Sequence, residues 1–235
     1  MPEDNDKEIA MREVPQTYDG RPLSARQAEE IHEIMCGAQV STAFRVAGRA
    51  IVLAATGHEN ITLGVGTGPG EGHVRGWNPR GRPSEAEQPA AARLILTTEL
   101  SEDIAEALYL DDPEFDMRWL CAEFGSYDIG ADDEMIDPDE HWRRRELIEA
   151  AAPWPGTVPT WTLDEQNENE MDTIRRAHRE QMEAALLGAA REAHTLLKDH
   201  WPDVEALAHA LMIGEVTSWT FAGQTFTIDP AESGS

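Results

Sequence analysis

Apolar side chains recur at helical spacing along most of the chain. A capping-box-like sequence precedes the first apolar run, which predicts a helix over about residues 24–37. Ser41 or Thr42 caps a second helix, which ends at Gly57. Its apolar stripe consists of Phe44, Ala47, Ile51 and Ala54 or Ala55. The N-terminal part of the chain therefore predicts two successive helices.

A glycine-rich segment separates two short apolar stretches, at residues 61–63 and 73–75. Such a pattern predicts two strands joined by a hairpin turn. Alternating glycines also occur in phosphate-binding loops, but no spacing here completes GxGxxG and no Lys-Ser/Thr pair follows. We therefore interpret the segment as a hairpin.

Helical periodicity returns after the hairpin. It predicts helices at about residues 89–100, 101–110, 116–124, 141–151, 168–200 and 202–214. The last two form a helical hairpin broken at Trp201-Pro202, and residues 220–228 predict a short strand or ribbon. The expected fold is mainly α with a minor β component: a helical domain with a small β-hairpin and a C-terminal helical hairpin.

Polar and Pro-containing segments mark the expected boundaries. Residues 1–22 are predicted to form a flexible acidic leader, residues 23–216 one helical domain, and residues 217–235 a C-terminal strand and tail. An acidic loop is expected at residues 128–140, and an extended connector containing Trp154 and Trp161 follows the short helix near residue 150.

Charge narrows the range of partners. The 235 residues include 45 acidic and 19 basic side chains, a formal net charge of −26, which disfavours nucleic acid and anionic membranes as direct partners. No apolar run approaches the length of a membrane span, and the N-terminus lacks the apolar core of a signal peptide. We therefore expect a cytoplasmic protein, with Cys36 and Cys121 as small buried thiols.

The second predicted helix carries the most specific motif. Residues 42–52 have the sequence TAFRVAGRAIV. This resembles the active-site helix of FtsH-type ATP-dependent zinc peptidases, whose pattern is T-A-aromatic-H-E-A-G-H-A-V-V. The framework positions match, whereas Arg45 and Arg49 replace the two histidine ligands and Val46 replaces the general base.

Three further segments support the resemblance, which covers about residues 41–214 with gaps. Residues 100–106, LSEDIAE, are similar to the family's L-A-G-x-x-A-E segment, with Glu102 in place of its glycine. In the family an Asp after Gly-Ala is the third metal ligand, a place that Asp133 or Glu134 would take here. Residues 200–208 are similar to part of the family's C-terminal helical hairpin.

The replacements remove the family's chemistry. A guanidinium group has no free lone pair and keeps its proton, so Arg45 and Arg49 cannot ligate zinc. Valine at position 46 cannot deprotonate a water molecule. The resemblance therefore implies a catalytically inactive, zinc-metallopeptidase-like protein without cofactor or ATP, which serves as a binding or regulatory module for a protein or peptide.

Arginines four residues apart on a helix are neighbours, which suggests a structural substitute for the metal. We hypothesise that Arg45 and Arg49 pair with carboxylates and that Asp133 or Glu134 supplies them. The rival use of the two arginines is capture of an anionic ligand.

Two other functions are kept as alternatives. The first is an active soluble zinc peptidase or hydrolase whose unconventional metal site combines His32 and Cys36 with acidic residues. The second is an acidic decoy or DNA mimic, for which the net charge is the only support. The remaining concentrated positive charge, Arg143-Arg144-Arg145, is interpreted as part of an ion-pair network.

Overall fold

The structure is a computed structural model that describes residues 25–66, 70–125, 138–154, 165–214 and 216–229, with the side chains of residues 25–36, 138–141 and 165–171 excepted. The expected leader at residues 1–22, nearly all of the acidic loop and Trp161 of the connector lie outside this part.

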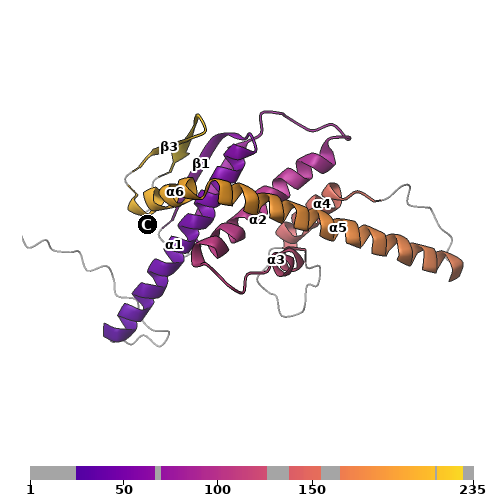
Figure 1. The fold of residues 1–235 in the computed structure, drawn as a ribbon, viewed down its shortest axis with the longest axis horizontal. Helices are drawn as coiled ribbons and strands as arrows, with labels where there is room; N and C mark the ends of the chain where they lie inside the picture. The colour runs from indigo at the N-terminus through magenta and orange to yellow at the C-terminus, as the bar shows by residue number, and fades with distance from the viewer. Residues whose placement is uncertain (1–24, 67–69, 126–137, 155–164, 215, 230–235) are drawn as a thin grey trace, which may run out of the picture.

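Six helices and four strands make up the described chain, and the expected mainly α fold with a minor β component is confirmed (Figure 1). In chain order the elements are α1 (Ala25–Ala55), β1 (Glu59–Val65), β2 (Gly72–Trp77), α2 (Gln88–Leu110), α3 (Met117–Phe124), α4 (Pro138–Ala151), α5 (Glu165–Asp199), α6 (Trp201–Ile213), β3 (Ser218–Phe221) and β4 (Gln224–Ile228). No described helix combines the length and apolar character needed to cross a membrane.

Two predicted helix boundaries are wrong. Residues 25–55 form one helix, because Gly37 keeps a helical backbone and an interior glycine costs only about 1 kcal/mol relative to alanine. Residues 88–110 likewise form one helix, in which Ser101 donates its hydroxyl hydrogen to the carbonyl oxygen of Thr98. The Ser101 side chain therefore bonds within the helix and does not cap a new one.

The predicted break before α6 is confirmed, and its chemistry is visible at both ends of the helix. Pro202 occupies the first turn, where its missing N–H has no intrahelical partner to lose. Gly214 ends the helix in the left-handed conformation, with φ of 69°. α5 and α6 are thus two helices joined at a short turn (Figure 1).

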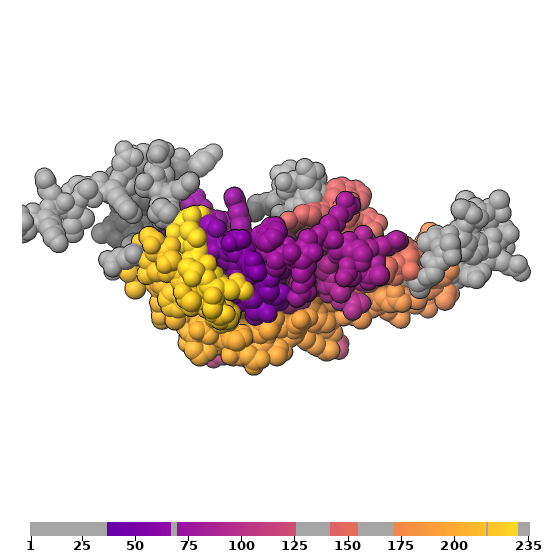
Figure 2. All heavy atoms as spheres, turned by 90° about the horizontal axis from the view of Figure 1, so that it is seen from above, coloured from indigo at the N-terminus to yellow at the C-terminus, as the bar shows by residue number. Residues whose placement is uncertain are grey.

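The strands form one sheet in the order β2-β1-β4-β3. β1 and β2 form the predicted antiparallel hairpin, and β4 lies parallel to β1. The C-terminal stretch is the ribbon alternative: Ala222 and Gly223, both with positive φ, make the turn between β3 and β4. Residues distant in sequence therefore complete the sheet. Figure 2 shows the C-terminal residues, in yellow, directly against the indigo residues of the N-terminal part.

α1 is the central element of the core. It packs against α2, α6, β1 and β2, and its residues from Ala43 to Ala54 are buried except for Arg45 and Arg49. α1 and α2 are in close contact at Gly48, since a Cβ atom built on it would be 2.4 Å from the Cβ of Ala105. This close approach positions the charged residues of the two helices.

Candidate functional site

A cluster of charged side chains joins α1 to α2 at the positions that the sequence motif singles out. Arg45 Nη2 lies 3.0 Å from Asp103 Oδ1, and Arg45 Nη1 lies 3.3 Å from Glu106 Oε2. Arg49 Nη1 lies 2.5 Å from Glu102 Oε1, which also has its second oxygen 3.7 Å from Arg45. We call these five residues the α1–α2 charge cluster.

Helical geometry explains the arrangement. Arg45 and Arg49 are one turn apart on α1, while Glu102 and Glu106 are one turn apart on α2 with Asp103 next to the first. Gly48 and Ala105, which lie between these positions, have almost no side chain to separate the helix backbones. The long arginine side chains therefore reach the carboxylates across the helix interface.

The cluster is partly shielded from water. Relative exposure is 41% for the Arg45 side chain and 27% for that of Arg49. Burial raises the pKa of Asp103, and the negative charges of Glu102 and Glu106 add to this rise. Arg45, followed by Arg144, opposes it. Both arginines of the cluster are thus held by carboxylates, and a third guanidinium group, that of Arg144, lies close enough to act on Asp103.

Val46 lies on another face of α1 and is part of the core, only 4% exposed. β2 covers it: a Cβ atom built on Gly72 would be 2.5 Å from Val46 Cγ2. The neighbouring Thr42 strengthens this contact, because its Oγ1 accepts a hydrogen bond from the Gly70 N–H at 3.0 Å. Position 46 is thus occupied by an apolar side chain packed under the hairpin.

The residues at this site do not fit a zinc ion. Arg45 and Arg49 offer only N–H donors, and both are held by carboxylates of α2. Within the described residues no group of three or more His, Cys, Asp and Glu side chains is arranged to hold a metal. His32, Cys36, Asp133 and Glu134 have side chains outside the described part, so their expected roles stay predictions.

The hypothesised pairing of Arg45 and Arg49 with carboxylates is observed, but the partners described are on α2. Sequence reasoning missed Glu102, Asp103 and Glu106 as partners, although LSEDIAE places these carboxylates at i, i+1 and i+4, on one side of a helix. Glu102 contacts both arginines. The sequence shows the spacing of these carboxylates. Only the packing of α1 against α2 shows that they face the two arginines.

The Arg143-Arg144-Arg145 segment of α4 also forms ionic and aromatic contacts. Arg143 Nη2 lies 2.6 Å from Glu99 Oε1 of α2, and Arg145 Nε lies 3.0 Å from Glu149 Oε1 within α4. The guanidinium carbon of Arg144 is 4.7 Å from the ring centroid of Phe124. The ion-pair interpretation is confirmed for Arg143 and Arg145.

A buried histidine that the sequence did not single out serves the fold. His178 of α5 is 4% exposed, and its Nε2 lies 2.8 Å from the carbonyl oxygen of Ala152, just after α4 ends. Its ring stacks on Trp154, with 4.0 Å between centroids. Trp154 of the connector therefore packs on α5 through this histidine.

Comparisons of the chain with protein-family models, with curated proteins and with solved structures find no match. The relation to FtsH-type peptidases therefore rests on the residues of the motif and remains a proposal.

A double-mutant cycle measures how strongly the cluster joins the two helices. We expect Arg49→Met and Glu102→Gln to show a coupling energy of about 1 kcal/mol in urea unfolding, because this pair is close and partly buried. Arg175 and Asp172 form the matched control pair, at 3.4 Å with both side chains more than half exposed. Its coupling should stay below about 0.5 kcal/mol. Equal coupling in the two pairs would contradict a structural role for the cluster.

Proposed function

We propose that this chain is a catalytically inactive, zinc-metallopeptidase-like protein that acts as a binding or regulatory module for a protein or peptide. The observation that carries the proposal is the α1–α2 charge cluster, in which Arg45 and Arg49 pair with carboxylates at the positions where the resembling family holds its metal ligands. In this proposal ion pairs replace the metal as the link between the active-site helix and its neighbour.

The burial of Val46 supports the loss of catalysis independently of the arginines. Hydrolysis of a peptide bond needs a group that accepts a proton from the attacking water, and such general-base catalysis contributes about two to four orders of magnitude in rate. An apolar side chain packed under β2 provides neither the proton acceptor nor space for water. Restoring one ligand position would therefore not restore the site.

The ion pairs of Arg45 and Arg49 bear on one alternative function of the site. The rival use of Arg45 and Arg49, capture of an anion, is disfavoured because Arg45 faces three carboxylates and Arg49 faces Glu102. The proposal also includes cytoplasmic residence and the absence of direct binding to nucleic acid or ATP. These parts rest on the sequence expectations alone.

Zinc content and peptidase activity test the proposal together. The untagged protein, purified without chelator, should contain far less than one zinc per chain by elemental analysis. It should also leave a library of fluorogenic peptides uncleaved, at a rate equal to that of a no-protein blank and unaffected by EDTA. An active zinc peptidase assayed in parallel is the positive control for both measurements.

Bound zinc and peptide cleavage would contradict different parts of the proposal. Stoichiometric zinc with EDTA-sensitive cleavage would overturn the proposal and favour the unconventional hydrolase. The variants His32→Ala and Cys36→Ser would then show whether those side chains hold the metal. Stoichiometric zinc without cleavage would contradict the replacement of the metal by ion pairs.

A further inference from the structure

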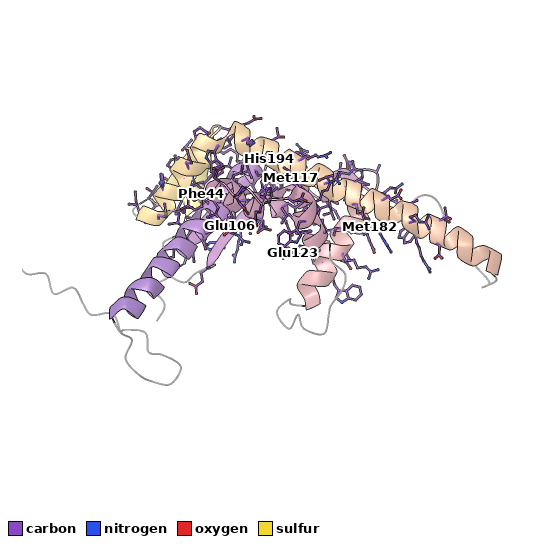
Figure 3. All side chains as sticks on the ribbon, turned by 60° about the horizontal axis from the view of Figure 1, so that its bottom comes forward. Phe44, Glu106, Met117, Glu123, Met182 and His194 are labelled. Carbon is purple, nitrogen blue, oxygen red and sulfur yellow. The ribbon has the colours of Figure 1, made fainter. Side chains whose placement is uncertain are left out.

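The α1–α2 charge cluster also forms one wall of a groove. Arg45, Asp103 and Glu106 line a cavity of about 390 Å³ that extends along the C-terminal part of α2 to α3 and reaches α4. Glu106 of α2 and Glu123 of α3, which both line it, lie between α1 and α4 in Figure 3. We call this cavity the acidic groove.

Large apolar side chains are exposed along the acidic groove. Trp119 of α3 is 64% exposed and Leu110, the last residue of α2, is 59% exposed. Phe115 lies in the groove as well, packed against the core. Exposed aromatic and aliphatic side chains that gather in one groove are typical of a binding surface.

The charged side chains around this apolar floor are mainly acidic. Four carboxylates line the groove, those of Asp103, Glu106, Asp112 and Glu123, against the two guanidinium groups of Arg45 and Arg144. Arg45 is held by the carboxylates of α2, and Arg144 stacks on the ring of Phe124. The segment between α2 and α3 adds the exposed side chains of Asp111, Glu114 and Asp116. The surface therefore attracts cations.

We propose that the acidic groove binds a short basic peptide segment of a partner protein, in which a large apolar side chain is flanked by arginine or lysine. The proposal deepens the binding role proposed above and rests on it. The apolar side chain packs between Leu110 and Trp119, while the flanking cations pair with Asp112 and Glu123. An arginine of the peptide also stacks on the exposed indole ring of Trp119.

Charge complementarity selects this occupant over others. Nucleic acid phosphates are repelled by the groove carboxylates, and a second copy of this chain brings a further net charge of −26. A purely apolar ligand leaves Asp112 and Glu123 without a cation to pair with. A basic segment with an apolar anchor matches both the carboxylates and the exposed apolar side chains of the groove.

Calorimetry with three synthetic peptides of equal length tests the proposal. The first peptide carries leucine and phenylalanine flanked by arginines, the second has glutamate at each arginine position, and the third has alanine at each apolar position. We expect measurable binding of the first peptide only, weakened as salt is raised because exposed charges are screened. Equal binding of the first and third peptides would overturn the proposal, since charge alone would then explain it.

Variants of the full chain locate the site. Trp119→Ala should weaken binding of the first peptide at least about tenfold, the size expected for an aromatic anchor. Trp77→Ala, at a tryptophan of β2 that is 56% exposed, is the matched control and should leave the affinity unchanged. Equal losses in the two variants, or a loss in neither, would overturn the proposal.

A second pair of variants tests the charges. Asp112→Asn with Glu123→Gln should weaken binding severalfold and reduce its salt dependence. The control replaces two exposed carboxylates of α5 and α6 in the same way, Asp199→Asn with Glu205→Gln, and should have little effect. An equal effect of the two double variants would indicate attraction to the net charge and contradict a site in the groove.

Whether the peptide is cleaved distinguishes a failure of the groove proposal from a failure of the proposed function on which it rests. Mass spectrometry after the titration should recover the first peptide intact. Cleavage together with Trp119-dependent binding would refute the catalytically inactive role and leave the groove assignment standing. Absence of binding by a zinc-free protein that cleaves nothing would refute the groove assignment alone.

Discussion

Replacing Phe226 with alanine should lower the free energy of unfolding by about 3–5 kcal/mol, the range found for large core aromatics. Phe226 is fully buried in β4, an interior strand of the sheet, and its ring centroid lies 6.4 Å from that of Phe221. Truncation leaves a cavity between the C-terminal hairpin and the helical core. Urea unfolding followed by circular dichroism measures the loss.

Thr225→Ala is the matched control for Phe226→Ala. Thr225 is on the same strand, but its side chain is on the opposite, exposed face. The cost there should stay within about 1 kcal/mol, the span of strand preferences. If both variants lose the same stability, the β3–β4 hairpin is not part of the cooperative core, and the parallel pairing of β4 with β1 contributes little.

Replacing Gly48 with alanine should destabilise the protein by about 1–3 kcal/mol, although the same change in an open helix is favourable. The new Cβ atom would lie 2.4 Å from the Cβ of Ala105 and 3.2 Å from Leu197 Cδ2. α1 and α2 must therefore separate, which also lengthens the contact between Arg49 and Glu102. Urea unfolding measures the change in stability.

Gly188→Ala and a compensating substitution are the controls for Gly48→Ala. Gly188 is exposed in α5, and a Cβ atom added to it would have no neighbouring atom within 4 Å, so alanine there should stabilise by about 0.4–1 kcal/mol. Adding Ala105→Gly to Gly48→Ala removes the clashing methyl group and should recover part of the loss. A stabilising Gly48→Ala would show that the helices are not in close contact.

Much of the helical architecture was predictable because helix formation depends on nearby residues. Apolar spacing located α3, α5 and α6, and the proline and glycine at the ends of α6 marked its boundaries. The errors occurred near Gly37 and Ser101, where helical hydrogen bonding and packing continue through the predicted boundaries. Local preferences of this size are small compared with the packing of a buried helix face.

The sheet and the charge cluster depend on contacts between distant residues. Thr62 pairs with Thr227, and no local pattern indicates that the C-terminal ribbon returns to β1. The partners of Arg45 and Arg49 likewise depend on which helix faces α1. Asp133 and Glu134 were the partners expected, whereas those observed are fifty or more positions along the chain, on α2.

By itself the sequence determined the helical class, the two-stranded hairpin, the two C-terminal helices with the break between them, and the absence of histidine and glutamate at positions 45, 46 and 49. These properties follow from residue chemistry and from spacing within one element. Only the tertiary structure decided that Val46 is sealed under β2, that α2 supplies the carboxylates, and that Leu110 and Trp119 share a groove. Each of these features depends on the packing of two elements that are distant in sequence. The burial of a side chain and the pairing of its charge are therefore set by the contact between the elements and not by either segment alone.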